Sequence, residues 1–532
     1  MGEGERCHWA WGYKCRLPDE AARRALAQRL GALFGTGDLL CRPLPALRDA
    51  RIPEARIEPP ANVPGSGGRV ERACHTYGKS YFRSEFASAP DWVAYPESEA
   101  HIEELLAFCA RENVAAVPFG GGTSVVGGVE GSAGTSYRGV ISIDLGRLDR
   151  VLEVDPISLA ARIQAGARGP ALEAQLAPHE LTLRHYPQSF EFSTLGGWIA
   201  TRAGGHFATL YTHIDDLVES IRMVTPTGIF QSRRLPASGA GPAPDRLVLG
   251  SEGIFGVITE AWVRVRARPR WRVSASARFP TFEQGVEAAR GVAQSGLHPA
   301  NCRLLDSGEA MLHGVSGGAS AGEAVLLLGF ESSDHALEPW IMRALELAKA
   351  SGVVCSTPVY RGAEERKGGD DASSWRQAFF DAPYLQSALV TMGAVVDTFE
   401  TACTWGRFPA LHQAVTETVH AAMKEQCGTG FLTCRFTHVY PDGPAPYYTF
   451  IAPGRDGDEV DQWAQSKRAA SNALLAHGAT ITHHHAVGRL HWPWYAREQP
   501  EPFGRALVAA KRALDPHGVM NPGVLVDADR AP

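Results

Sequence analysis

The stretch His185–Gly204, HYPQSFEFSTLGGWIATRAG, combines glycines, hydroxyl side chains and one arginine in an apolar setting. Gly196, Gly197 and Gly204 lack a Cβ atom and so allow a ligand to approach the backbone closely. The hydroxyls of the neighbouring Ser and Thr residues and the guanidinium of Arg202 add hydrogen-bonding groups. These features favour a binding segment for a long cofactor that carries phosphates and a flat polar ring. A glycine-rich turn between two strands is the alternative interpretation.

A second glycine-rich stretch, Pro118–Ser124, follows the short apolar run Val114–Val117, which we expect to be a buried strand. Successive backbone N–H groups in such a loop can form a concave binding site for phosphate oxygens. The loop does not match G-x-G-x-x-G, no helical pattern follows it, and no Gly-Lys-Ser/Thr is present. A Rossmann site and a Walker loop are therefore disfavoured. A plain turn between strands remains the alternative.

A third stretch, Gly250–Glu260 (GSEGIFGVITE), has the same character. Gly253 and Gly256 allow close approach, and the β-branched residues that follow predict a return into a sheet. The alternative is a tight turn that feeds a strand. The surrounding sequence predicts a helix capped by Ser98 and strands over 140–145, 150–154 and 159–165.

The composition excludes several classes of protein. The chain has 532 residues, 44% of them apolar, and a net charge of -6 without a basic run, so nucleic acid is not an expected partner. Its ten cysteines form no C-x-x-C pair, which argues against a zinc site and against a disulfide framework. We see neither a signal peptide nor an apolar run of about 18 residues, so neither secretion nor a transmembrane helix is expected.

Three further features can carry acid-base or anion chemistry. His483, His484 and His485 are consecutive, and in an extended run His483 and His485 would face one way and His484 the other. Histidine suits proton transfer near neutral pH, while metal binding and a structural role are the alternatives. Tyr447 lies in an alternating strand pattern, where a buried tyrosine is more often structural. Arg303 lies in an apolar stretch and needs an anionic partner, for which Asp306 is a structural candidate.

Taken together, the segments FEFSTLGGW, GSEGIFGVITEA and the triple histidine resemble the vanillyl-alcohol-oxidase/PCMH superfamily, and more narrowly the alkyldihydroxyacetonephosphate synthase family, from about Trp92 to Val524. The resemblance implies an α+β fold. It comprises a PCMH-type two-part FAD-binding domain and an α/β substrate (cap) domain, with helical N-terminal and C-terminal segments. We expect an N-terminal arm and linker at 1–88, the FAD-binding domain at 89–269, the cap at 270–455, and a C-terminal segment at 456–532 that completes the active site.

The resemblance also implies the cofactor and the residues that hold it. The pyrophosphate loop has no histidine, so we expect FAD to be bound without a covalent link. The implied FAD-binding residues are Pro118, Phe119, Gly120, Gly121, Gly122, Thr123, Ser124, Gln188, Ser189, Phe190, Glu191, Phe192, Ser193, Thr194, Thr201, Arg202, Ala203, Gly204, Glu252, Gly253, Ile254, Phe255, Gly256, Val257 and Ile258. No metal site is expected.

By the same resemblance, Tyr447, His483, His484, His485 and Arg303 are catalytic, and Arg303 and Gln386 contact the substrate. Gln386 stands where the family has an arginine that contacts the substrate phosphate, and a glutamine cannot supply a charged fork to a phosphate. Gln188 likewise replaces a carboxylate, and Ala486 and Arg489 replace the usual glycine and lysine of the histidine segment.

The implied reaction exchanges the acyl chain of acyl-dihydroxyacetone phosphate for a fatty alcohol, in ether-lipid synthesis, with no net redox change. An FAD-dependent oxidase or dehydrogenase of a hydroxy acid or alcohol is the alternative, because the same flavin domain serves both. We therefore expect a small lipid or hydroxy-acid substrate. We further expect a cytoplasmic homodimer with peripheral membrane contact.

Overall fold

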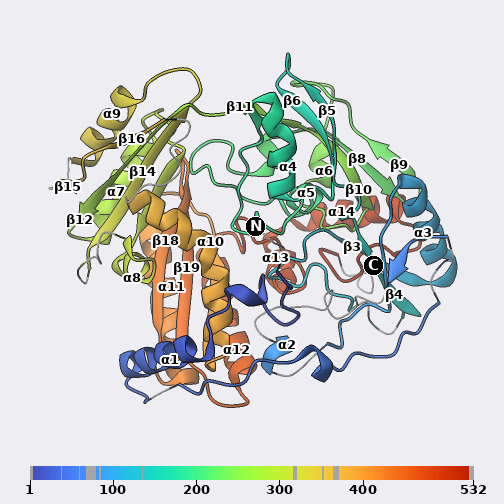
Figure 1. Cartoon of the computed structure of the whole chain (residues 1–532), viewed down its shortest axis with the longest axis horizontal. Coiled ribbons are helices and arrows are strands. Elements are labelled where there is room, and N and C mark those ends of the chain that lie inside the picture. The colour runs from blue at the N-terminus through green and yellow to red at the C-terminus, as the bar shows by residue number, and fades with distance from the viewer. Residues whose placement is uncertain are drawn as a thin grey trace.

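The computed structural model describes residues 4–37, 39–58, 60, 62–66, 79–82, 86–132, 134, 136–315, 320, 322–349, 353–362 and 371–526. Figure 1 shows the large sheet on the left and the smaller sheets on the right. None of the described helices is long and apolar enough to span a membrane.

The half of the molecule that carries the three expected FAD-binding segments, called the FAD-side half below, contains two sheets and a two-stranded pair. The first sheet has the order β1-β2-β4-β3 and is parallel except at β1. The second has the order β5-β6-β10-β8-β9 and is antiparallel throughout. The strands are β1 (Gly65–Ser66), β2 (Trp92–Ala94), β3 (Val114–Phe119), β4 (Gly139–Asp144), β5 (Val151–Asp155), β6 (Ala160–Gln164), β8 (Val218–Thr225), β9 (Gly228–Gln231) and β10 (Val257–Arg264), with β7 (Leu181–Thr182) paired to β11 (Arg266–Ala267).

Helix α3 (Glu99–Glu112) explains how local sequence builds this half. The Ser98 hydroxyl accepts the N–H of His101, as the capping pattern predicts, and the left-handed Asn113 ends the helix. The apolar face of α3 is fully buried in the core between the two sheets. Helices α4 (Gly169–Leu176), α5 (Leu195–Thr201) and α6 (Asp245–Val248) complete this half.

The second half is built on one antiparallel sheet, ordered β15-β12-β14-β13-β18-β19-β17, with β16 also paired to β12. Its strands are β12 (Trp271–Phe279), β13 (Asn301–Leu305), β14 (Ala324–Ser332), β15 (Val354–Cys355), β16 (Val359–Arg361), β17 (Ala394–Glu400), β18 (Phe431–Val439) and β19 (Pro444–Pro453). The helices around it are α7 (Phe282–Ala293), α8 (Ser307–Leu312), α9 (Glu338–Lys349), α10 (Asp371–Val390), α11 (Phe408–Cys427) and α12 (Glu459–Ala476).

Alternation along β19 separates the two faces of this sheet. Tyr448 and Phe450 point into the core under α11, whereas Tyr447 and Thr449 point to the opposite face, beside α10. The alternating strand pattern expected around Tyr447 is therefore confirmed.

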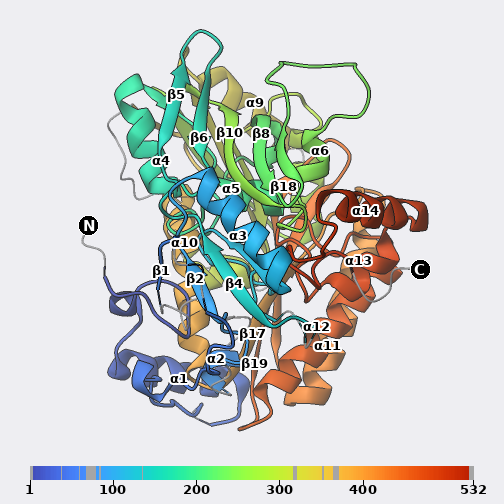
Figure 2. The same ribbon diagram turned by 90° about the vertical axis from the view of Figure 1, so that its right-hand side faces the viewer.

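The two ends of the chain return to opposite halves. Helix α1 (Glu20–Phe34) lies along the large sheet, and Phe34 packs on Phe431 of β18. Helices α13 (Trp492–Glu498) and α14 (Glu501–Leu514) lie on the FAD-side half, where Met520 forms a parallel bridge with Ala116 of β3. Figure 2 shows α13 and α14 on one side of the molecule and α1 at its lower end. The chain between α12 and α14 thus crosses from one half to the other.

Candidate functional site

A cavity of about 300 Å³ lies between the two halves. The FAD-side half contributes the loop after β3 and the segment around α5, and the other half contributes α10 and the face of the large sheet that carries Tyr447. The expected residues that line the cavity are Gly120, Gly121, Gly122, Thr123, Ser124, Gln188, Ser189, Ser193, Thr194, Thr201, Ala203, Gly204, Arg303, Gln386, Tyr447, His484 and His485. One cavity therefore joins the two glycine-rich segments to the expected acid-base groups.

The loop after β3 is suited to an anion. Within the described part of the chain, the backbone N–H groups of 120–125 donate no hydrogen bond to protein. Gly122 has a left-handed φ of 67°, which curls the loop. Successive unpaired N–H groups in a loop that lines a cavity form a ready binding site for phosphate oxygens.

The segment before and through α5 is held by its own hydroxyl groups. Thr194 Oγ1 caps α5 by accepting the N–H of Gly197 at 3.3 Å, and Ser193 Oγ accepts the indole N–H of Trp198 at 2.7 Å. Arg202 does not line the cavity; its guanidinium pairs with Asp215 at 2.7 Å. Pro118, Phe119, Phe190, Glu191 and Phe192 also lie outside the cavity lining.

The third glycine-rich stretch lies outside the cavity lining and holds the backbone of the histidine segment. None of the residues Glu252, Gly253, Ile254, Phe255, Gly256, Val257 and Ile258 lines the cavity. Instead, the buried carboxylate of Glu252 accepts the N–H groups of Val487 and Gly488 at 2.9 Å. Burial raises the pKa of Glu252 to about 7, although these two hydrogen bonds act in the opposite direction. This stretch therefore ties the FAD-side half to the end of the histidine segment.

A second buried carboxylate shapes the histidine segment itself. Glu400, at the end of β17, accepts the N–H groups of His483, His484 and His485 at 2.6, 3.1 and 2.9 Å, and the Thr482 hydroxyl at 2.6 Å. Burial opposes ionisation of Glu400, but the surrounding imidazoles, His484 foremost, hold its pKa well below the usual range.

The run is therefore curled around a carboxylate and is not extended, so the expected alternation of its side chains is wrong. His484 and His485 both line the cavity, whereas His483 does not. His483 Nε2 instead forms a hydrogen bond of 2.7 Å with the hydroxyl of Tyr440. Burial lowers the pKa of His484 to about 3 and that of His485 to about 4, so both rings are neutral at pH 7. A neutral ring is able to accept a proton.

Tyr447 and Arg435 form a stacked pair in the cavity wall. The guanidinium of Arg435 lies 3.8 Å from the centre of the Tyr447 ring and pairs with the buried Glu309 at 2.9 Å. Burial raises the pKa of Tyr447, and Arg435 opposes this shift. The Tyr447 and His484 rings lie 6.0 Å apart and nearly parallel.

Arg303 is buried in the cavity wall, and no carboxylate lies within ion-pair distance of it among the described residues. Its Nη1 donates to Asn301 Oδ1 at 2.7 Å and its Nη2 to the His206 carbonyl at 3.1 Å, while Nε has no partner. Asp306 does not pair with it, because that carboxylate caps α8. A buried guanidinium without a carboxylate is typical of an anion-binding site.

Two of the four replacements noted in the sequence lie at α10, Gln386 within it and Gln188 in contact with it. Gln188 donates to the carbonyl of Phe379, and Gln386 donates to Asp397 at 3.3 Å. Asp397 also lines the cavity. The wall beside Gln386 therefore lacks the arginine that the resemblance implies and also carries a carboxylate. The Asp397 carboxylate makes this part of the wall unfavourable for an anion.

Other cavity residues were not expected from the sequence. His438 and Arg435 of β18 line it, as do Arg6, Trp9 and Trp11 of the N-terminal segment. Arg6 donates to the Gly121 carbonyl at 3.3 Å and lies over the Phe192 ring. The tryptophans at 9 and 11 were the available signal, since aromatic residues in a segment without periodicity need a surface to pack on.

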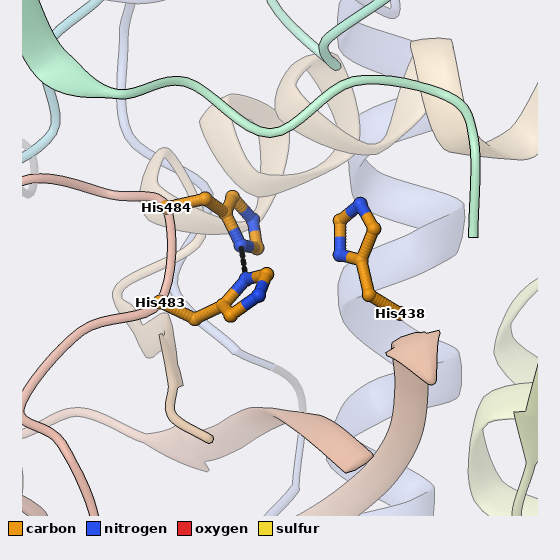
Figure 3. Close-up of side chains that lie close together, drawn as sticks. All are labelled: His438, His483 and His484. Carbon is orange, nitrogen blue, oxygen red and sulfur yellow. Dashed lines mark hydrogen bonds between the residues drawn. The ribbon is translucent and has the colours of Figure 1, made fainter. Parts of the chain in front are cut away.

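Three imidazoles, His438, His483 and His484, lie close together (Figure 3), and two of them, His438 and His484, line the cavity. Their nearest nitrogens are all within 4.8 Å of one another, so the geometry also admits a metal ion. His483 Nδ1 and His484 Nδ1 lie 3.0 Å apart, which is a hydrogen-bond distance.

Sequence comparison agrees with this architecture. Residues 90–232 match the FAD binding domain family, and residues 268–525 match the C-terminal domain of FAD linked oxidases. The chain is 31% identical to alkyldihydroxyacetonephosphate synthase of Dictyostelium discoideum over 476 residues, which is 86% of this chain and 78% of that protein. The chain belongs to the alkyldihydroxyacetonephosphate synthase family.

Related proteins extend the comparison. The synthase of Trypanosoma brucei brucei is 29% identical over 86% of this chain and 77% of its own length, and the cytochrome D-lactate dehydrogenase of Arabidopsis thaliana is 26% identical over 86% and 76%. A solved alkyldihydroxyacetonephosphate synthase covers 91% of this chain and 88% of its own, at 25% identity and a TM-score of 0.73. p-Cresol methylhydroxylase shares the fold, with a TM-score of 0.65 at 12% identity over 84% of this chain and 91% of its own. The expected fold class is confirmed.

The cofactor of this family is FAD, and the residues present fit it. The unpaired N–H groups of 120–125 suit its pyrophosphate, and the hydroxyl-bearing segment before α5 lines the same cavity. The precise contacts of the individual residues with FAD stay a prediction.

Glu400→Gln tests whether the carboxylate positions the histidine segment. A glutamine has one acceptor oxygen where the carboxylate has two, so at least one N–H of the run loses its partner. We expect turnover to fall roughly tenfold while FAD stays bound, because leaving a buried donor unsatisfied costs about 1–3 kcal/mol. Steady-state kinetics and the flavin content measure this. Unchanged turnover in a fully loaded variant would assign Glu400 a role in folding alone.

Proposed function

We propose that this protein is a transferase of the alkyldihydroxyacetonephosphate synthase type, which replaces the acyl chain of acyl-dihydroxyacetone phosphate by a fatty alcohol. One observation carries the proposal. In a chain of this family, a single cavity combines the anion-binding glycine loop, the uncompensated Arg303, Tyr447 and two neutral imidazoles.

Arg303 is proposed to hold an anionic group of the substrate. Its Nε is buried and without a partner, and its guanidinium has no carboxylate to neutralise it among the described residues. Burial lowers its pKa to about 10, so it is still protonated at pH 7. A charged donor in a buried site binds a phosphate more strongly than a neutral donor does.

His484, His485 and Tyr447 are proposed to move protons on the substrate side. The exchange of an ester for an ether consumes an alcohol, R–OH, and releases a carboxylic acid that ionises at pH 7. One proton therefore leaves the cavity in each turnover, and a neutral imidazole is the group suited to accept it. His483 is not in the cavity lining, so its proposed part is indirect.

The remaining walls suit alkyl chains. Trp9, Trp11, Val129, Phe379 and Val390 bring apolar surface to the cavity. FAD, when bound, supplies a flat, electron-poor ring system against which the substrate reacts. We also propose that the protein acts as a cytoplasmic homodimer that meets its lipid substrates at a membrane surface, which light scattering and vesicle flotation would test.

The decisive experiment follows flavin absorbance and product together. Acyl-dihydroxyacetone phosphate and hexadecanol should yield the alkyl product under anaerobic conditions, and the flavin should remain oxidised after turnover. A lasting bleach of the flavin by a hydroxy acid or an alcohol, without acyl exchange, would instead establish the oxidase or dehydrogenase function.

Replacing Arg303 by methionine removes the guanidinium at similar length. A charge-assisted hydrogen bond contributes about 1.5–3 kcal/mol, so binding of acyl-dihydroxyacetone phosphate should weaken roughly ten- to a hundredfold. Gln386→Met is the matched control on α10 and should have a smaller effect, because the amide of Gln386 already donates its hydrogen bond to Asp397. Equal losses in both variants would contradict the assignment of the anion to Arg303.

The absence of histidine from Pro118–Ser124 predicts non-covalent FAD. Acid precipitation should release the flavin into the supernatant at about one FAD per chain. Flavin retained in the pellet would overturn the non-covalent part only. A colourless protein that FAD cannot reconstitute would overturn the flavin assignment altogether.

A further inference from the structure

A line of hydrogen-bonded imidazoles runs from the cavity toward the surface. His484 lines the cavity, and its Nδ1 lies 3.0 Å from His483 Nδ1. His483 Nε2 lies 3.2 Å from His213 Nε2, and His213, just before the short turn Ile214–Asp216, is partly exposed. The outermost ring therefore comes from the FAD-side half and the two inner rings from the segment that crosses between the halves.

The proton positions on this line follow from its outer end. His213 Nδ1 lies 2.9 Å from the carbonyl oxygen of Arg202, and a carbonyl can only accept, so this Nδ1 carries a proton. Burial lowers the pKa of His213, with Asp215 and Asp216 acting in the opposite direction and Arg202 adding to the shift. In the neutral ring the second nitrogen, Nε2, is therefore an acceptor.

The nitrogen that carries the proton in each of the next two rings, His483 and His484, then follows. His483 Nε2 faces the bare Nε2 of His213 and the hydroxyl of Tyr440, 2.7 Å away, so its own proton lies on Nε2. Tyr440 can donate its proton onward to Thr212 Oγ1 at 3.0 Å. His483 Nδ1 is then bare and accepts from His484 Nδ1, which leaves His484 Nε2 as the bare nitrogen. His484 Nε2 has no hydrogen-bonding partner among the described residues.

We propose that His484, His483 and His213 form a proton relay that carries the alcohol proton out of the cavity. The proton binds His484 Nε2, the Nδ1 proton of His484 passes to His483 Nδ1, and the Nε2 proton of His483 passes to His213 Nε2. Each inner ring gains one N–H bond and loses another, and the positive charge ends on His213. Loss of that proton to water and rotation of the rings return the line to its starting state.

The surroundings of His213 suit a transient cation. The Asp215 carboxylate is nearly fully buried, and its Oδ1 has no hydrogen-bonding partner. Its other oxygen already pairs with Arg202 and Arg246. Because these guanidinium groups partly neutralise the Asp215 charge, the carboxylate does not hold a proton permanently on His213. The exposed Asp216 adds a negative charge on the solvent side. The relay thus ends at a histidine that can be protonated transiently and then release the proton to water.

The direction of the relay rests on the proposed function, but the tautomers do not. Nitrogen NMR of protein labelled with ¹⁵N-histidine reports which ring nitrogen carries the proton. We expect His484 to carry it on Nδ1 and His483 on Nε2. A His484 ring protonated on Nε2 would overturn the relay, whether or not the protein exchanges acyl chains.

His213→Ala tests the transport step. In weak buffer, turnover should fall by at least about tenfold, and millimolar imidazole should restore it because a small base can replace the missing ring. His335→Ala, at an exposed histidine on the opposite half, is the control and should neither lose activity nor respond to imidazole. Normal turnover of His213→Ala in weak buffer would overturn the relay.

Two other outcomes are separated by the same measurements. A wild-type protein that fails to exchange acyl chains contradicts the proposed function, and the tautomers then decide the relay alone. A stoichiometric metal that His483→Ala loses would overturn the relay in favour of a metal site at His438, His483 and His484.

Discussion

His484→Ala should lower turnover by roughly 10²-fold or more while FAD remains bound, the usual scale for loss of a positioned base. His484 lines the cavity, and in the tautomer inferred above its Nε2 is the nitrogen free to accept a proton. Its backbone is held by Glu400, which the substitution does not touch, so the loop should keep its shape. Steady-state kinetics on flavin-loaded protein measures the loss.

The pH profile gives a second readout of the same assignment. Because burial lowers the pKa of His484 to about 3, the ring stays neutral as the pH falls from 7 to 5. Turnover should therefore show no acid limb from this ring in that range. A limb near pH 6.5 that His484→Ala removes would contradict the neutral-base assignment.

Matched variants separate the neighbouring groups. His485→Ala removes the second cavity imidazole, and Tyr447→Phe removes the Tyr447 hydroxyl while keeping the ring that stacks on Arg435; both should also reduce turnover strongly. His420→Ala, exposed on α11, should not. Near-normal turnover in all three cavity variants would return these residues to a structural role.

The sequence predicted the segments of the site better than their contacts. Short glycine-rich stretches after strands have few alternative uses, so Pro118–Ser124 and the segment before α5 could be related to one cofactor. The residues that face the cavity depend on backbone curvature, which no local pattern encodes. The histidine segment illustrates this, because a carboxylate about 80 residues away, Glu400, sets its shape.

Long-range partners account for the other differences. Glu252 and Arg202 belong to segments whose composition suggests cofactor binding. The Glu252 side chain nevertheless binds the backbone of 487–488, and that of Arg202 pairs with Asp215. Asp306 is three residues from Arg303 but caps α8 instead of neutralising it. The contribution of Arg6, Trp9 and Trp11 depends on the N-terminal segment reaching the cavity, which composition alone does not predict.

Gly121→Val should abolish FAD binding, although not for the reason that the loop composition suggests. From the sequence, a side chain at this position would enter the phosphate-binding loop. In the structure, a Cβ atom at Gly121 would lie 1.9 Å from the carbonyl oxygen of Phe192 and 2.9 Å from Ser193 Cα. Both obstacles are backbone atoms, so the two segments expected to bind FAD would have to separate.

Because the collision occurs at the Cβ atom itself, Gly121→Ala should lose FAD nearly as completely as Gly121→Val. Flavin content after purification and FAD titration of the apoprotein measure the loss, and circular dichroism checks that each variant folds. Gly291→Val in α7 is the matched control, since a Cβ there meets no atom within 4 Å, and it should bind FAD normally. Normal binding by Gly121→Ala with loss by Gly121→Val would contradict the packing argument and favour obstruction of the phosphate site by side-chain bulk.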